Sequence, residues 1–203
     1  DWMAEVAGWQ RQYPLIQHTN NPSGITPQEV LETLAELTSC EAVLTTEVGQ
    51  HQMWAAQFYT FRHPRQLLTS GGLGTMGYGL GAALGAQVAL PDKRVVNIAG
   101  DGSFHMNANE LSTAARYNIP IVELVFNNEV LGMVRQWQKL FYDNRFSQTT
   151  LDKKTNYELL AEAYGVRAMT ISSREEIRPV LEAALALKGP VLINCHIDRD
   201  QNV

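Results

Sequence analysis

Two apolar runs, each followed at once by a polar turn, constrain the fold of this chain more than any other feature. Residues 95–99 precede Gly100-Asp101-Gly102, and residues 121–126 precede Asn127-Asn128. Short runs rich in β-branched residues that end at glycine or asparagine are typical of buried parallel strands. Residues 107–117 between them have a helical pattern, which completes a βαβ unit. Because the crossover of such a unit is right-handed, we expect Asp101 and Asn128 to lie at the same carboxyl edge of one sheet.

The two side chains expected at this edge suit a hard cation. Mg²⁺ prefers oxygen ligands in near-octahedral geometry and usually keeps substrate phosphates in its shell. A carboxylate from Asp101 and a carboxamide from Asn128 would leave room for a diphosphate, which Gly102 would allow the backbone to approach closely. Either residue alone is more often a turn residue or a helix cap, so it is the pair that indicates a ligand site.

The rest of the chain alternates further strands with helices. Capping boxes that begin at Thr26 and Ser173 mark two helix starts. We predict an α/β domain over residues 26–203, with a doubly wound, mainly parallel six-stranded sheet and helices on both faces. The other four strands are predicted at residues 42–46, 66–69, 167–171 and 191–197. Residues 70–85 are glycine-rich, and the chain is then predicted to be helical up to about residue 90. Further helices are predicted over residues 131–141 and 157–164.

Residues 1–25 are predicted to lie outside this domain. Apolar residues at spacings of three and four over positions 2–13 indicate an amphipathic interdomain helix, and residues 20–24 have the composition of a linker. The chain begins without a methionine and ends without an obvious closing element. We therefore expect a segment of a longer protein.

Charge and cysteine content exclude several function classes. The net charge is -5 and there is no basic run, so we expect neither nucleic acid nor a membrane as a partner. No apolar stretch reaches the length of a transmembrane helix. Cys40 and Cys195 lack the spacing of metal ligands, and two thiols in 203 residues suggest structural cysteines in a reducing, cytoplasmic compartment.

A glycine-rich stretch raises an alternative function. Residues 72–77 match the dinucleotide-binding pattern G-x-G-x-x-G, after a strand and before a helix. A dinucleotide-binding domain is therefore an alternative. The short, poorly apolar strand before the glycines counts against it, and a dinucleotide site would not need Gly100, Gly102 or Asn127-Asn128.

The order Gly-Asp-Gly-Ser at residues 100–103 and Asn-Asn at 127–128 resembles the signature of thiamine-diphosphate (ThDP) enzymes. The resemblance implies that Asp101, Asn128 and the Val130 carbonyl hold Mg²⁺ on the cofactor diphosphate. It also implies that Met76 wedges the bent cofactor. The Gly74 carbonyl and the Met76 N–H would then meet the aminopyrimidine.

Three longer stretches, at residues 48–57, 70–77 and 132–138, resemble the catalytic subunit of acetolactate synthase (acetohydroxyacid synthase). The resemblance covers essentially the whole chain, as the C-terminal ThDP-binding domain of that transferase. Gly81 departs from it, since the family often has proline there. The implied reaction is the decarboxylation of pyruvate and its condensation with a second 2-keto acid, pyruvate or 2-ketobutyrate. This reaction serves branched-chain amino acid (isoleucine and valine) biosynthesis.

The same resemblance assigns roles to individual residues. The second keto acid would meet Met133, Val134 and Trp137. The remaining cofactor contacts would be made by Val48, Gly49, Gln50, His51, Gly102, Ser103, Leu131, Gly132 and Met133.

The resemblance also implies parts that we do not find in these residues. The glutamate that activates ThDP and most FAD contacts belong to other domains of the family, so we expect no catalytic residue here and an inactive isolated segment. Its loops at 49–54, 72–77 and 130–146 should be mobile, with Met53, Trp54, Met133 and Trp137 exposed. The implied assembly is a homodimer or tetramer, with a small regulatory subunit as a further partner. Another ThDP-dependent lyase or oxidase, such as glyoxylate carboligase or pyruvate oxidase, and a non-catalytic homologue remain alternatives.

Overall fold

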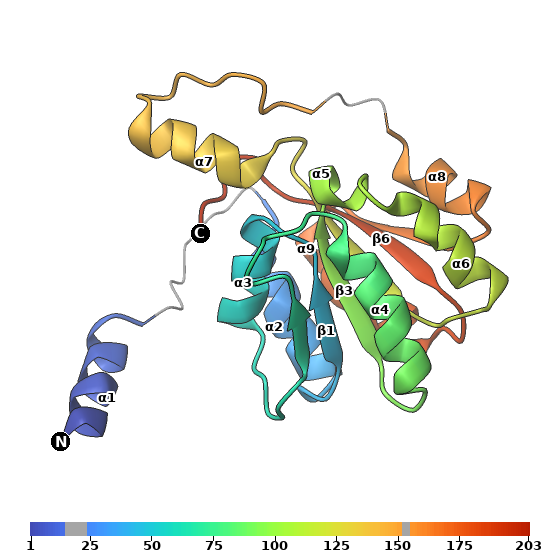
Figure 1. Cartoon of the computed structure of the whole chain (residues 1–203), viewed down its shortest axis with the longest axis horizontal. Coiled ribbons are helices and arrows are strands. Elements are labelled where there is room, and N and C mark those ends of the chain that lie inside the picture. The colour runs from blue at the N-terminus through green and yellow to red at the C-terminus, as the bar shows by residue number, and fades with distance from the viewer. Residues whose placement is uncertain (15–23, 152–154) are drawn as a thin grey trace.

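A sheet of six parallel strands forms the centre of the structure (Figure 1). The computed structural model describes residues 1–14, 24–151 and 155–203. The strands follow the order β2-β1-β3-β4-β6-β5 across the sheet. They are β1 (Val43–Thr46), β2 (Leu67–Thr69), β3 (Val95–Gly100), β4 (Val122–Asn127), β5 (Arg167–Ile171) and β6 (Val191–His196). The predicted strands agree with these bounds to within one residue at each end.

Helices cover both faces of the sheet, which confirms the predicted doubly wound α/β architecture (Figure 1). One face packs against α2 (Pro27–Leu37), α3 (Gln50–Phe58) and α9 (Arg174–Ala186). The other face packs against α4 (Tyr78–Ala89), α5 (Asp101–Phe104), α6 (Leu111–Arg116) and α8 (Tyr157–Ala163). A 3-10 turn, η1 (Ala108–Glu110), precedes α6, and α7 (Gly132–Phe141) follows β4.

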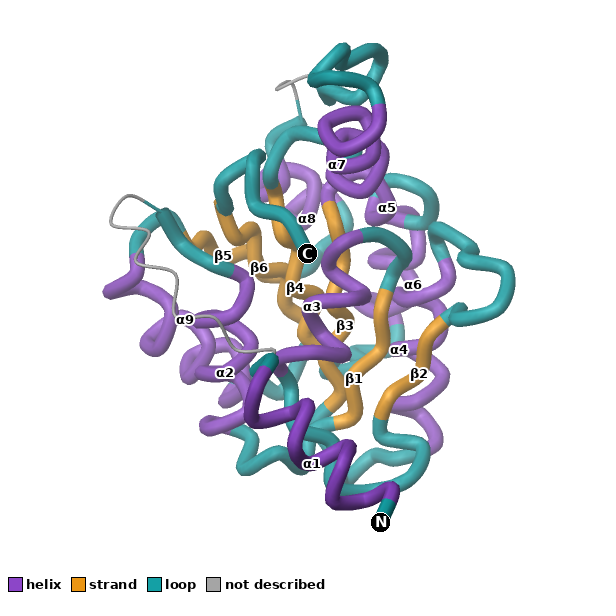
Figure 2. The backbone as a smooth tube through the Cα atoms, turned by 90° about the vertical axis from the view of Figure 1, so that its left-hand side faces the viewer, coloured by secondary structure: helices purple, strands orange, loops and turns teal. Residues whose placement is uncertain are grey.

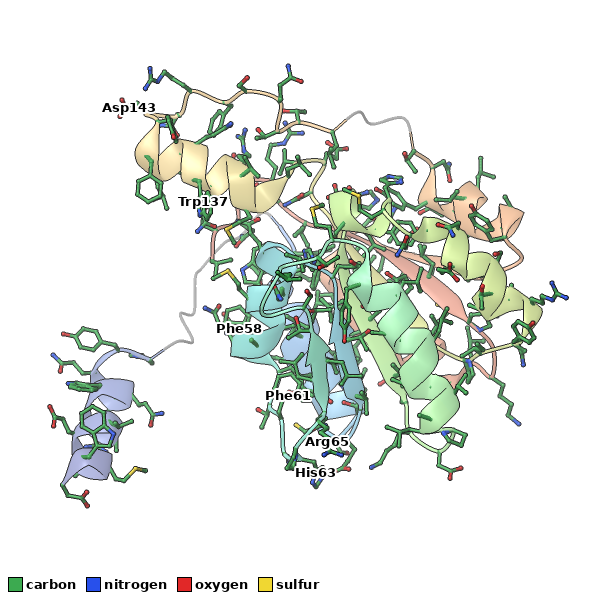
Figure 3. The ribbon with its side chains drawn as sticks, in the orientation of Figure 1. Phe58, Phe61, His63, Arg65, Trp137 and Asp143 are labelled. Carbon is green, nitrogen blue, oxygen red and sulfur yellow. The ribbon has the colours of Figure 1, made fainter. Side chains whose placement is uncertain are left out.

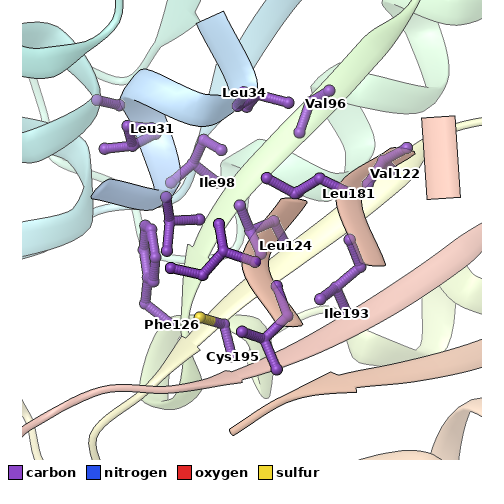
Figure 4. Packing of buried hydrophobic residues seen from close by; sticks show 14 of the residues in the cluster. Leu31, Leu34, Val96, Ile98, Val122, Leu124, Phe126, Leu181, Ile193 and Cys195 are labelled. Carbon is purple, nitrogen blue, oxygen red and sulfur yellow. The ribbon is translucent and has the colours of Figure 1, made fainter. Parts of the chain in front are cut away.

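The apolar faces of α2 and α9 form much of the core on the first face. Figure 4 shows Leu31 and Leu34 of α2 and Leu181 of α9 against the β-branched residues of β3 and β4. These three leucines are fully buried. Burial of one such side chain contributes roughly 1.5–3 kcal/mol, so this interface holds both helices on the sheet.

Both predicted capping boxes are present. Glu29 N–H donates to Thr26 Oγ1 at 3.3 Å, and Thr26 N–H donates back to Glu29 Oε2 at 3.1 Å. Ser173 and Glu176 form the corresponding box at the start of α9. Each box satisfies two N–H groups that the first turn of a helix leaves without an intrahelical partner.

Two segments differ from the prediction. Residues 50–58 form α3, where the sequence predicted a loop over 49–54; Gly49 precedes this helix and offers no capping side chain, so the usual start signal is missing. The single helix predicted over 107–117 is divided into η1 and α6. Asn107 itself lies outside both helices, because its φ is -139° and its side chain donates to the Gly77 carbonyl at 2.6 Å.

The strand order creates a switch point at the carboxyl edge. The chain moves from β1 outward to β2 and then returns to the other side of β1 to form β3. In open α/β sheets, ligands bind beyond the carboxyl ends of strands at such a point. Figure 2 shows α7 above this edge, over the ends of β3 and β4.

The N-terminal helix α1 (Trp2–Gln12) has no buried residue and lies away from the sheet in Figure 1. The rings of Trp2 and Trp9 meet edge to face at 5.4 Å. The predicted linker, residues 20–24, lies outside the described part of the chain except for Gly24, so the interdomain role of α1 stays a prediction. Within the described ranges, no helix is long and apolar enough to cross a membrane.

Candidate functional site: a cavity at the carboxyl ends of β1, β3 and β4

A cavity of about 200 Å³ lies at the switch point of the sheet. Three segments that are distant in sequence line it: residues 48–51 after β1, residues 100–103 at the end of β3, and Asn128 with residues 130–134 after β4. Met76 lines it from the glycine loop before α4. The parallel arrangement of three neighbouring strands therefore brings these segments together.

Asp101 provides a buried carboxylate at this cavity and is only 2% exposed. Oδ1 accepts from the Gly102 N–H at 2.8 Å, and Oδ2 accepts from the Glu129 N–H at 2.6 Å, which joins the loops after β3 and β4. Burial raises the pKa of Asp101 to about 6, although these hydrogen bonds oppose the rise. Among the described residues, no basic side chain forms an ion pair with Asp101. A bound dication would therefore offset a charge that the fold leaves uncompensated.

Asn128 lies beside Asp101 in the cavity wall and is also buried. Its Oδ1 accepts from the Val130 N–H at 3.2 Å, which fixes the turn that leads into α7. The described residues contain no cluster of three histidine, cysteine, aspartate or glutamate side chains suited to a metal. A cation here would instead combine one carboxylate, one carboxamide and a backbone carbonyl, which leaves sites for diphosphate oxygens.

Two glycines lie where the walls of the cavity approach each other. A Cβ at Gly102 would lie 2.7 Å from Leu131 Cδ2. A Cβ at Gly132 would overlap Gln50 Oε1 and lie 3.1 Å from Asn128 Nδ2. A side chain at either position would therefore require the end of Leu131 or of Gln50, both in the cavity wall, to move.

His51 and Gln50 line the cavity as neutral groups at the start of α3. Burial lowers the pKa of His51 to about 3, so its imidazole is uncharged at neutral pH. Its Nε2 lies 3.4 Å from Ser103 Oγ. Gln50 Nε2 donates to Gln136 Oε1 at 2.7 Å, whereas its Oε1 is buried without a hydrogen-bond partner in the described part of the chain. These groups can position a polar ligand but do not neutralise its charge.

Comparison with known proteins identifies the family. Residues 47–195 match the family described as "Thiamine pyrophosphate enzyme, C-terminal TPP binding domain". The chain belongs to this family. Thiamine pyrophosphate (TPP) is the same compound as ThDP. The match covers the sheet from just after β1 to β6 and every segment that lines the cavity.

Named relatives resemble nearly the whole TPP-binding chain. It is 44% identical over 202 residues to "Acetolactate synthase large subunit" of Porphyra purpurea, covering 99% of this chain and 34% of that protein. It is 44% identical over 203 residues to "Acetolactate synthase catalytic subunit, mitochondrial" of Saccharomyces cerevisiae, covering 98% and 29%. It is 46% identical over 185 residues to "Acetolactate synthase isozyme 3 large subunit" of Escherichia coli, covering 91% and 32%. The chain therefore spans about a third of the length of these relatives.

The structure places most of the predicted site residues of this TPP-binding domain around one cavity. Two do not line it. Gly74 lies in an exposed part of the glycine loop with a φ of 63°, and Trp137 is 56% exposed on α7 (Figure 3). The predicted residues that do line the cavity are Val48, Gly49, Gln50, His51, Met76, Asp101, Gly102, Ser103, Asn128, Val130, Leu131, Gly132, Met133 and Val134.

Sequence reasoning missed part of the apolar wall. Trp54, Met106 and Phe126 also line the cavity. The predicted exposure of Trp54 is wrong, because Trp54 is only 3% exposed and meets Phe126 edge to face at 6.2 Å. Its spacing of four residues from Gln50 would have placed both on one face of a helix, had α3 been recognised.

The strand order argues against the dinucleotide alternative. The glycine stretch follows β2, which is the edge strand of the sheet. In a dinucleotide-binding fold, this stretch follows the strand at the switch point and opens the helix whose N-terminus holds the pyrophosphate. Here the cavity lies beyond β1, β3 and β4 instead.

Proposed function

We propose that this chain is the part of an acetolactate synthase that holds the diphosphate of ThDP through Mg²⁺. The observation that carries the proposal is the cavity at the switch point, where three separate sequence motifs meet around the buried carboxylate of Asp101. The similarity to proteins named acetolactate synthase over nearly the whole chain supports the choice of reaction.

In this proposal Asp101, Asn128 and the Val130 carbonyl hold Mg²⁺. Bound ThDP supplies the carbanion chemistry that releases carbon dioxide from pyruvate and joins the remainder to a second 2-keto acid. The residues of this chain bind and orient the reactants. The apolar wall that includes Trp54 and Phe126 would shield the bound cofactor from water.

The second 2-keto acid, pyruvate or 2-ketobutyrate, would bind near Met133 and Val134. Both residues lie at the start of α7 and line the cavity. Trp137 lies one turn further along the same helix and is more than half exposed. Its proposed role in the substrate pocket therefore requires a covering surface that the described residues do not supply.

The activity of the whole protein involves further proposals. We expect the activating glutamate, most contacts to FAD, and the homodimer or tetramer to depend on residues outside this chain. A regulatory subunit and a place in isoleucine and valine biosynthesis are part of the same proposal. We expect no acetolactate from the 203-residue chain alone, because the glutamate that activates ThDP is expected to lie outside it.

The test is a product assay on the intact protein expressed from its complete gene. With Mg²⁺, ThDP and FAD present, we expect pyruvate to yield acetolactate, and Asp101→Ala to abolish both this activity and ThDP binding while the fold survives. Unchanged ThDP affinity in the folded variant would refute the ligand assignment. Oxygen consumption in place of acetolactate would indicate an oxidase, and activity restricted to glyoxylate would indicate a glyoxylate carboligase.

A further inference from the structure

The loop that carries Met76 has little support of its own. Residues 71–75 are all exposed, and the loop is closed mainly on itself, with the Thr75 N–H donating to Ser70 Oγ at 3.0 Å. Met76 is nevertheless half-buried and lines the cavity. Its position must therefore be determined at the other end of the loop, where Gly77 leads into α4.

Glu47 holds that end from the sheet. It follows β1 directly and is 1% exposed. Its Oε2 accepts from the Gly77 N–H at 2.5 Å, and its Oε1 accepts from the Leu80 N–H at 3.0 Å. These are N–H groups that the first turn of α4 cannot satisfy internally, and the helix dipole favours a carboxylate at this point. Since the Gly77 N–H shares a peptide with the Met76 carbonyl, Glu47 fixes the backbone of Met76 directly.

Asn107 holds Gly77 from the opposite side. This residue precedes η1, and its Nδ2 donates to the Gly77 carbonyl at 2.6 Å. Gly77 has a φ of 94°, and a Cβ there would lie 3.0 Å from Met106 Cβ and 3.2 Å from Asn107 Nδ2. Only glycine combines this left-handed backbone with so close an approach. Residues from the segments after β1 and after β3 thus both hydrogen-bond to Gly77.

We propose that Glu47 and Asn107 are positioning residues for the thiamine end of the cofactor. By hydrogen-bonding to the N–H and the carbonyl of Gly77, they place Met76 in the cavity. The inference rests on the proposed function, in which Met76 contacts the organic part of ThDP while Asp101 and Asn128 hold the diphosphate. The two halves of the ligand are therefore held by different parts of the fold. Loss of either hydrogen bond to Gly77 should therefore weaken the binding of the thiamine half of the ligand and not of the diphosphate half.

The experiment compares two ligands in the intact protein at saturating Mg²⁺. Titration calorimetry gives the Kd of ThDP and of inorganic pyrophosphate for wild type, Glu47→Gln and Asn107→Ala. The control is Gln87→Ala. Gln87 is buried at the far end of α4, where its Nε2 donates to the Leu90 carbonyl at 3.2 Å and the Lys93 carbonyl at 2.8 Å. This control loosens the same helix away from the cavity.

We expect both Glu47→Gln and Asn107→Ala to weaken ThDP binding about tenfold or more and to leave pyrophosphate binding within about twofold of wild type. The control should lower Tm and leave both constants within about twofold. Unchanged ThDP binding in these two variants, or equally weakened binding of ThDP and pyrophosphate, overturns the inference. If Glu47→Gln does not fold, Asn107→Ala alone decides, because Asn107 is exposed. Absence of acetolactate formation by wild type would refute the proposed reaction but not this inference, which depends on the two Kd values.

Discussion

Replacement of Asp101 by asparagine should stabilise the cofactor-free protein and at the same time remove its affinity for Mg²⁺. The pKa of Asp101 is raised from 3.8 to about 6 by burial. The stabilising contribution of the neutral carboxyl is complete below pH 3.8 and is lost as the pH rises through about 6. At pH 7.5 the native state therefore carries the full cost of a buried carboxylate.

The magnitude follows from the same contacts. A shift of about two pKa units corresponds to roughly 3 kcal/mol of unfolding free energy at pH 7.5. Asparagine retains one acceptor oxygen, so it can serve either the Gly102 or the Glu129 N–H but not both. Loss of the second hydrogen bond costs about 1–1.5 kcal/mol, which leaves a net stabilisation of roughly 1.5–2 kcal/mol.

The assay is denaturant unfolding of the intact protein, without metal or cofactor, at several pH values between 5 and 7.5. The variant should be more stable than wild type at pH 7.5, and the difference should shrink as the pH falls through 6. A difference that does not change with pH, or a variant that is less stable at pH 7.5, would refute the reasoning. Asp101→Ala is the matched control, since it removes the charge but leaves both N–H groups without an acceptor, and we expect it to be less stable than Asp101→Asn.

Addition of Mg²⁺ and ThDP should reverse the order of stability of wild type and Asp101→Asn. At 100 times Kd, Mg²⁺ and ThDP together should stabilise wild type by about 2.7 kcal/mol and leave the asparagine variant unchanged. Equal stabilisation of both proteins would show that the carboxylate of Asp101 is not needed for binding.

Three further substitutions test other parts of the structure. Gly132→Ala should weaken ThDP binding at least tenfold by calorimetry, because a Cβ there overlaps the cavity wall; Gly81→Ala, which has open space within 4 Å, is the control and should stabilise α4 by about 0.5–1 kcal/mol. Burial raises the pKa of Glu123 well above its usual range, so Glu123→Gln should change stability at pH 7 by less than about 1 kcal/mol. Glu123→Ala should cost roughly 2–4 kcal/mol, because it leaves a cavity and leaves Asn97 Nδ2 without its acceptor; equal losses in denaturant unfolding would contradict this. Trp137→Leu should lower the preference for 2-ketobutyrate over pyruvate by roughly tenfold in a competition assay, and an unaltered product ratio would exclude Trp137 from the substrate pocket.

The amino-acid sequence alone determined the sheet and the place of the site. Runs of β-branched residues marked β3 and β4, and the alternation of six strand segments with helices indicated parallel order. The carboxyl ends of parallel strands share one edge, so the residues after residues 95–99 and 121–126 had to come together. This argument placed Asp101 beside Asn128, and the cavity contains both.

Only the tertiary structure decided which side chains face the cavity and what holds them. Helix α3 starts without a capping side chain, so its presence and the inward orientation of Trp54 depend on packing against β3 and Phe126. Glu47 and Asn107 each bond to Gly77 across thirty residues of chain. Local periodicity contains no information about such contacts, because they are made between elements that meet only when the sheet has assembled. A strand end can thus be predicted from its own residues, whereas the direction of a side chain beyond it depends on every element packed around it.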